Sequence, residues 1–280
     1  MYRHAFLILA HESENQLQSL LTALDAEGCD VYVHIDAKSG FDGMSLTMRN
    51  GQLYILSNRI DCRWGDYSLV EAELNLIEEA SRNADYAYLH LISGTDYPLN
   101  GVGHIFDYCK INSGKEFIGF SQNVTDRELE WRYGRRFLFC RDFQNPSLVK
   151  RMMGRIYASL QSLPDLGRKI DAEVRKGSQW CSITSEFARY VLSRRDWIRK
   201  HFSHTYCPDE AVMQTLAWNS RFRDRIFDVA DEFRGCMRFI PWVDGCLRPF
   251  GAEDFTAMKQ SERFFGRKFS LKDIETYERL

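Results

Sequence analysis

The chain has 280 residues, of which 44% are hydrophobic and 14% aromatic, enough to fill the core of one large domain or of two small ones. Its 37 basic and 39 acidic residues leave a net charge of −2, which excludes a nucleic-acid-binding protein that depends on overall positive charge. The eight cysteines form no Cys-x-x-Cys pair, so we expect reduced and mostly buried thiols.

Apolar runs alternate with amphipathic stretches over the first 120 residues. The apolar stripe of an amphipathic helix is found at 13–27, where Ser13 is the N-cap, and again at 67–83. Short apolar runs predict buried strands at 5–10, 31–35, 53–56, 86–92 and 116–120. This order predicts an α/β fold with a mainly parallel sheet flanked by helices.

The first apolar run is only about six residues long, shorter than the core of a signal peptide, and acidic residues follow it directly. No apolar stretch approaches the roughly 20 residues that cross a bilayer. We therefore expect a cytoplasmic protein that can contact the inner face of the membrane.

Polar residues follow the predicted strands. Ligands of open α/β sheets bind beyond the carboxyl ends of the strands. Those ends carry His11, Asp36, Ser57 and the segment 93–96, so we expect a binding crevice there. For Asp96 a simpler interpretation stays open, because its Ser-Gly-Thr-Asp-Tyr-Pro context favours a carboxylate that bonds its own turn.

The pattern weakens between residues 121 and 177, where basic residues accumulate over 127–155. Two interpretations stay open: a solvated, partly helical insertion, or a surface that faces an acceptor or a membrane. Beyond it, the sequence predicts strands at 179–183 and 238–242, helices at 185–192 and 209–218, and two helical stretches in the last 28 residues.

Two distant segments suggest chemistry. Glu210 follows Pro208 and Asp209 in the expected first turn of a helix, where it either complements the helix dipole or acts as a base for a hydroxyl group. Arg267 and Lys268 lie between phenylalanines, either as a surface pair or as donors to phosphate oxygens. The chain contains no Asp-x-Asp, no acidic pair suited to Mg²⁺, and no complete zinc set, so no metal is expected.

Eight short motifs occur in a fixed order along nearly the whole chain, at 5–11, 32–39, 63–68, 88–98, 177–180, 208–210, 238–242 and 265–269. Together they resemble the core-2/I-branching β-1,6-N-acetylglucosaminyltransferases and peptide O-xylosyltransferases, glycosyltransferase family 14, in a compact bacterial form. The resemblance implies one GT-A-like domain over 1–280, with a nucleotide-binding half (1–120) and an acceptor and diphosphate-binding half (121–280). It also implies inverting, metal-independent transfer from a UDP-sugar, with GlcNAc and xylose as first candidates.

On the donor side, the resemblance places Asp36 at the uracil, Ser57 near the uridine, and Arg267 with Lys268 at the diphosphate. We add His11 because of its position after the first strand. Arg248 is a candidate partner for Lys268, although Cys246-Leu-Arg-Pro249 departs from the His-Pro that often precedes a basic residue in the family.

On the acceptor side, the resemblance implies that Glu210 is the general base and that Trp242 lines the acceptor site. The other expected substrate contacts are Asp96, Trp64, Glu128 and Arg132. The partner would be a glycan or a lipid-linked saccharide of a growing polysaccharide. Two other classes stay open: a non-catalytic sugar- or nucleotide-binding protein of the same fold, and a metal-dependent nucleotidyltransferase.

Overall fold

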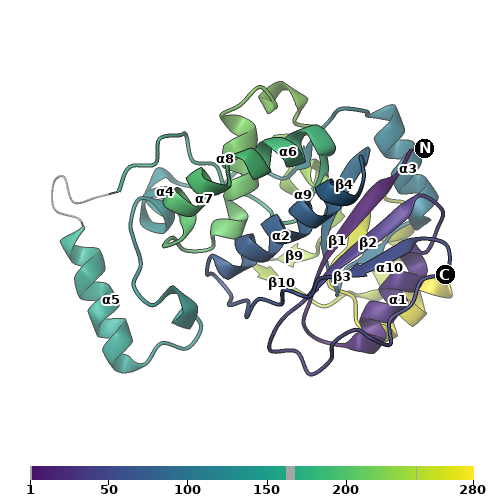
Figure 1. The fold of residues 1–280 in the computed structure, drawn as a ribbon, viewed down its shortest axis with the longest axis horizontal. Coiled ribbons are helices and arrows are strands. Elements are labelled where there is room, and N and C mark those ends of the chain that lie inside the picture. Colours follow the sequence, from purple (N-terminus) through teal and green to yellow (C-terminus); the bar gives the residue numbers. More distant parts are fainter. Residues whose placement is uncertain (1, 162–167, 244) are drawn as a thin grey trace.

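The computed structural model describes residues 2–161, 168–243 and 245–280. Its centre is a six-stranded sheet in the order β3-β2-β1-β4-β7-β6 (Figure 1). Strands β3, β2, β1 and β4 are parallel to one another, whereas β7 runs antiparallel to both β4 and β6. The predicted mainly parallel α/β fold is confirmed. The strands are β1 (His4–Ala10), β2 (Cys29–Ile35), β3 (Gln52–Ile55), β4 (Tyr88–Ser93), β6 (Phe117–Ile118) and β7 (Cys181–Thr184).

Alternating residues of β1 explain why its sequence is apolar from Ala5 to Ala10. Ala5, Leu7 and Leu9 pack into one core cluster, which also contains buried residues of α2 (Ser68–Asn83), α6 (Ser185–Ser193) and α8 (Val212–Trp218). Phe6, Ile8 and Ala10 pack into a second cluster, with α1 (Glu14–Leu24) and α3 (Gly101–Ile111). Because successive side chains of a strand point to opposite faces, both faces of the sheet are covered.

A small second sheet joins the end of the chain to the central one. It has the order β5-β11-β8, formed by β5 (Tyr97–Pro98), β11 (Phe265–Gly266) and β8 (Arg238–Phe239). A third apolar cluster packs beside it, with residues of α10 (Ala252–Lys259) and α11 (Leu271–Glu278), the two helical stretches predicted near the C-terminus. The remaining elements are α4 (Asp126–Tyr133), η1 (Cys140–Asp142), α5 (Leu148–Leu160), α7 (Arg195–Phe202), η2 (Pro208–Glu210), η3 (Arg223–Arg225), α9 (Glu232–Gly235), β9 (Trp242–Val243) and β10 (Cys246–Leu247).

Several predicted elements differ from the observed ones. Helices α3 and α7 were not predicted, and the strand expected at 116–120 is only two residues long. The helix expected from residue 209 begins at Val212, because Pro208–Glu210 forms a separate 3₁₀ turn. The segment 121–177 is partly helical as predicted, and its residues 162–167 lie outside the described part of the chain.

The cysteines are free thiols, and all of them are buried except Cys62, which is partly buried, and Cys246, which is exposed. The expectation of mostly buried thiols is confirmed. Among the described helices, none combines the length and apolar character needed to cross a membrane.

Candidate functional site

A cavity of about 380 Å³ lies at the carboxyl ends of β1, β2 and β4, where the sequence predicted a crevice. Five of the predicted site residues line it: His11, Asp36, Trp64, Arg267 and Lys268. The other lining residues are Leu9, Ala10, His34, Lys38, Cys62, Leu69, Ser93, Gln144, Gln179 and Trp180.

Asp36, which lines the cavity, directly follows β2 and is buried. Its carboxylate accepts hydrogen bonds from the backbone N–H of Lys38 at 2.8 Å and from the Lys38 ammonium at 2.8 and 2.9 Å. The same ammonium lies 2.8 Å from Asp61. Hydrogen bonds from Lys38 and Arg63 lower the pKa of Asp61 to about 2, so Asp61 keeps its charge over the neutral pH range. Lys38 was not predicted as a site residue.

Arg267 and Lys268, which also line the cavity, follow β11. Arg267 donates to the fully buried Asp96 at 2.7 Å, and its guanidinium lies 4.1 Å from the centre of the Trp180 ring. Asp96 also accepts from the backbone N–H of Ser93, so it stands behind Arg267 and does not line the cavity. Within the described residues, no carboxylate lies within ion-pair distance of Lys268. A fixed guanidinium and an unpaired ammonium suit a diphosphate.

Glu210 lies in the η2 turn, and its two carboxylate oxygens have different surroundings. Oε2 accepts from Arg132 at 3.0 Å and lies 3.4 Å from the Lys176 ammonium. Oε1 has no hydrogen-bond partner in the described part of the chain. Arg132 also pairs with Glu128 at 2.9 Å, so the fold brings together three of the predicted acceptor-side residues. Lys176 was not predicted.

Glu210 does not line the cavity, but two contacts join its turn to the cavity wall. Gly177, two residues before the lining residue Gln179, donates its N–H to the Glu210 carbonyl at 2.8 Å. Tyr206 packs edge-on against Trp64, with ring centres 5.6 Å apart, and its ring centre lies 5.3 Å from the Arg132 guanidinium.

Two buried carboxyl groups lie behind Glu210. Asp209 and Glu73 of α2 are buried, and Gln179 donates to Glu73 at 2.6 Å. Burial, with a further contribution from the Glu210 charge, raises the pKa of Asp209 to about 7. Burial and the neighbouring Asp209 likewise raise the pKa of Glu73 well above its ordinary value. Glu73 was not predicted, but its place between Val70 and Ile77 on the apolar stripe of α2 is a signal that could have identified it.

Three predicted residues lie away from this cavity. Ser57 is exposed beyond the end of β3. Arg248 makes two hydrogen bonds to Asp254, at 2.6 and 2.8 Å. Trp242 lies on β9 with 54% of its surface exposed. None of the three is among the lining residues.

Among the described residues, one group has metal-ligand composition: His4, His90 and Cys109, whose donor atoms lie within 4.8 Å of one another. All three are buried, and the two rings share a hydrogen bond of 2.8 Å between His4 Nδ1 and His90 Nε2. Its nitrogen and sulfur donors do not suit Mg²⁺, which prefers oxygen ligands. The group does not line the cavity.

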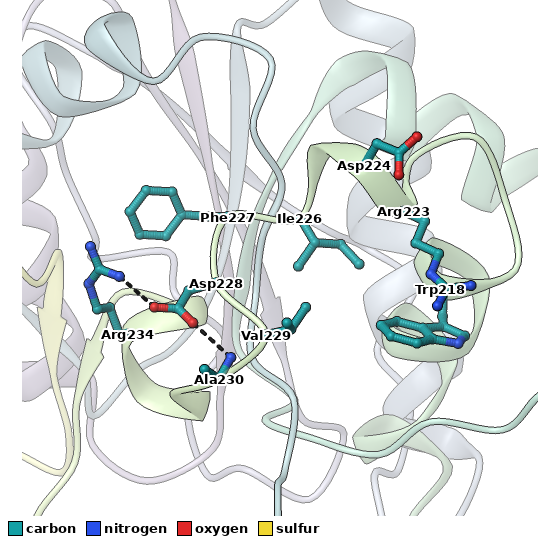
Figure 2. Close-up of a pocket in the computed structure, with 9 residues that line it drawn as sticks. All are labelled: Trp218, Arg223, Asp224, Ile226, Phe227, Asp228, Val229, Ala230 and Arg234. Carbon is teal, nitrogen blue, oxygen red and sulfur yellow. Dashed lines mark hydrogen bonds and ion pairs between the residues drawn. The ribbon is translucent and has the colours of Figure 1, made fainter.

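A second depression, of about 560 Å³, contains none of the predicted site residues (Figure 2). The guanidinium groups of Arg223 and Arg175 lie 3.8 and 4.1 Å from the centre of the Trp218 ring, so this ring already has partners where a sugar would stack. Arg234 and the Ala230 N–H both bond to Asp228, as Figure 2 shows. Asp228, Arg234 and the Ala230 N–H are therefore engaged with one another.

The mainly parallel sheet, with helices on both faces and a cavity at its carboxyl edge, defines a mixed α/β domain. The family model "Branch: Core-2/I-Branching enzyme" matches residues 4–259, so the chain belongs to the Core-2/I-Branching enzyme family. The family inferred from the motifs is thereby confirmed, and the chain is a member of a glycosyltransferase family.

Curated relatives agree with this membership. Xylosyltransferase 2 of Rattus norvegicus is 24% identical over 296 residues, which cover 96% of this chain and 32% of the relative. Beta-1,3-galactosyl-O-glycosyl-glycoprotein beta-1,6-N-acetylglucosaminyltransferase of Bos taurus is 21% identical over 304 residues, 98% of this chain and 67% of the relative. The chain spans about a third of the length of the xylosyltransferase. The crystal structure of mouse Xyloside xylosyltransferase 1 in the apo form aligns with 98% of this chain and 99% of that chain, at 10% identity and a TM-score of 0.44.

Proposed function

We propose that this protein is an inverting, metal-independent glycosyltransferase that moves a sugar from a UDP-sugar to a glycan hydroxyl group. The observation that carries the proposal is the cavity itself, which is lined both by Asp36 and by the Arg267–Lys268 pair. In this proposal the uracil contacts Asp36, and the diphosphate lies against the two cations.

In the proposed reaction, Glu210 is the general base and the two cations stabilise the leaving group. Glu210 Oε1 takes the proton of the acceptor hydroxyl, whose oxygen attacks the anomeric carbon from the face opposite the UDP. The bond from the anomeric carbon to the diphosphate oxygen breaks, and its electron pair leaves with UDP. Arg267, held by Asp96, and Lys268 stabilise the charge that develops on the departing diphosphate.

The donor sugar is proposed from the names of the relatives, which are a xylosyltransferase and an N-acetylglucosaminyltransferase. Xylose and GlcNAc are therefore the first donors to test. The proposed acceptor is a glycan or lipid-linked saccharide of a growing polysaccharide, and the proposed location is the cytoplasm.

Calorimetric titration of UDP and of a panel of UDP-sugars, with EDTA present throughout, tests the proposal. We expect UDP to bind without metal, and Lys268→Ala to weaken that binding. Lys272→Ala, which removes an exposed lysine from α11, is the matched control and should bind UDP as the unaltered protein does.

Binding that requires Mn²⁺ would overturn the fixed-cation proposal. Metal-free binding with no transfer to any acceptor and no slow hydrolysis of the donor would instead identify a non-catalytic binding protein.

A further inference from the structure

Helix α5 lies at one end of the long axis of the molecule and stands apart from the helices that cover the sheet (Figure 1). None of its residues is buried. Its large apolar side chains are between 45% and 81% exposed, a high exposure for residues of this kind. They are Leu148, Val149, Met152, Met153, Ile156 and Leu160.

The exposed apolar residues form a single face. With about 100° of rotation per residue, all six fall within an arc of roughly 140° on the helix surface. Three basic residues border this arc: Arg151 and Arg155 lie on one side of it and Lys150 on the other. The helix contains no acidic residue. An apolar face bordered by basic side chains is the pattern of a helix that lies in the surface of a membrane.

The charges of α5 also indicate what covers the apolar face. Arg151 and Arg155 are exposed and have no carboxylate partner among the described residues. Lys150 pairs with Asp142 at 2.7 Å. Two copies of α5 packed face to face would bring like charges together at the rim, which disfavours a second copy of the chain. Anionic headgroups complement the same charges.

We propose that α5 binds the surface of an anionic membrane, with its apolar face in the headgroup region and its arginines against lipid phosphates. This surface comprises Leu148–Leu160 and requires no change in the central sheet.

The neighbouring segment connects this surface to the cavity. Gln144, four residues before α5, lines the cavity, and Arg141 pairs with Asp61 at 2.7 Å. Asp61 in turn pairs with the lining residue Lys38. A membrane-bound α5 would therefore hold the cavity close to the bilayer. Resting on the proposed function, this placement favours an acceptor that carries a lipid.

Flotation of the full chain with vesicles tests the membrane contact without any enzymatic assay. We expect binding to phosphatidylcholine vesicles that contain about 30% phosphatidylglycerol, and weak binding to phosphatidylcholine alone. Met152→Ser with Ile156→Ser, and separately Arg151→Glu with Arg155→Glu, should each lower the affinity about tenfold or more.

Matched control variants replace an exposed apolar residue, or reverse exposed basic residues, on helices other than α5. Ile111→Ser alters an apolar residue that is 82% exposed at the end of α3, and Lys110→Glu with Lys272→Glu reverses two exposed charges. These variants should bind vesicles as the unaltered chain does.

Three results would overturn the membrane proposal: no vesicle binding, equal losses in the control variants, or a dimer in light scattering that Met152→Ser with Ile156→Ser abolishes in the absence of vesicle binding. The last result would assign the face to a second copy. UDP titration of the same variants separates the two proposals, because a chain that binds vesicles but not UDP would refute only the proposed reaction.

Discussion

At the scale of the residue, the two oxygens of the Glu210 carboxylate differ: one contacts two cationic side chains, and the other has no hydrogen-bond partner among the described residues. Arg132 and Lys176 both contact Oε2 and so hold the side chain in one orientation. Oε1 has no bonded partner within the described residues and is free to accept a proton from a hydroxyl group. This arrangement suits the proposed general base, because one carboxylate oxygen is held and the other is unbonded among the described residues.

Glu210→Gln should lower the turnover number about 10²–10⁴-fold, because the amide keeps the shape of the side chain but removes the base. UDP affinity should stay nearly unchanged, since Glu210 does not line the cavity. Initial transfer rates and UDP calorimetry would measure the two effects. Glu128→Gln is the control, because it removes a charge beside Arg132 without removing the base. A larger loss in the control than in Glu210→Gln would contradict the assignment.

At the scale of the element, small strands and turns position the charged side chains. Arg238 of β8 is fully buried and donates to the carbonyls of Leu91 in β4 and Cys181 in β7, each at 3.0 Å. Its guanidinium also lies 4.7 Å from the centre of the Phe265 ring in β11. Arg238 therefore joins the central sheet to the strand that leads into Arg267 and Lys268.

The position of the η2 turn, which contains Glu210, depends on the close approach of the backbone at Gly177 to the backbone at Gly119. A Cβ atom on Gly177 would lie 1.9 Å from the Gly119 carbonyl oxygen, so only glycine fits there. Since the Gly177 N–H donates to the Glu210 carbonyl, any displacement of Gly177 moves the η2 turn.

Gly177→Ala should therefore lower both the transfer rate and the melting temperature, the rate because Glu210 is displaced and the stability because the backbones must separate. Gly103→Ala in α3 is the control: its Cβ would meet no atom within 4 Å, and alanine favours a helix. Thermal unfolding and transfer rates of both variants would measure the difference. An active Gly177→Ala protein of unchanged stability would contradict this account of the turn.

At the scale of the whole molecule, one core unites the two halves of the sequence. Strand β7, from the second half, lies between β4 and β6 of the first. Buried carboxyl groups occur in both halves, with Glu73 on α2, Glu116 before β6, and Asp209 before α8. Burial is the largest cause of a raised pKa for all three, to about 7 for Glu116 and Asp209.

These groups predict how the stability of the protein depends on pH. The folded chain retains their protons to a higher pH than the unfolded chain, so the contribution of these carboxyl groups to the free energy of unfolding should decrease as the pH rises from about 4 through about 7. The buried His4 and His90, whose pKa values burial lowers, contribute with the opposite sign in the acidic range. Glu73→Gln removes one of these groups and retains an acceptor for Gln179. Because burial raises the pKa of Glu73 well above its ordinary value, the melting temperature of the variant should fall less than that of the unaltered protein as the pH is raised from the acidic into the alkaline range.

Some dependence on pH should remain in Glu73→Gln because Glu116 is unchanged. Glu71→Gln, on an exposed position of the same helix, is the control for the loss of one charge. Equal pH profiles for Glu73→Gln and the unaltered protein would show that the buried carboxyl of Glu73 does not carry the effect.

The sequence alone was enough to predict the mainly parallel central sheet and a crevice at the carboxyl ends of its strands. Apolar runs at β1, β2 and β4 are local signals of burial on both faces, and polar residues that follow such runs lie at one edge of a parallel sheet. The pattern of strands therefore sufficed to predict Asp36 at the cavity, and the family motifs pointed to Arg267 and Lys268, which line the same cavity. Helix α3 was not predicted because its apolar stripe is weak, with only Val102, Ile105 and Cys109 buried.

The pairing of charged side chains, by contrast, is visible only in the tertiary structure. The Asp96–Arg267 and Arg132–Glu210 contacts join residues that are 171 and 78 positions apart, and the spacing of residues in a sequence does not report such distances. For the same reason, the sequence did not predict that Arg248 pairs with Asp254. It also did not predict that Lys38 contacts Asp36 or that Lys176 contacts Glu210. The amphipathic pattern of α5 is likewise in the sequence, but its exposure depends on which elements pack against it, and this packing is settled by the arrangement of the whole chain.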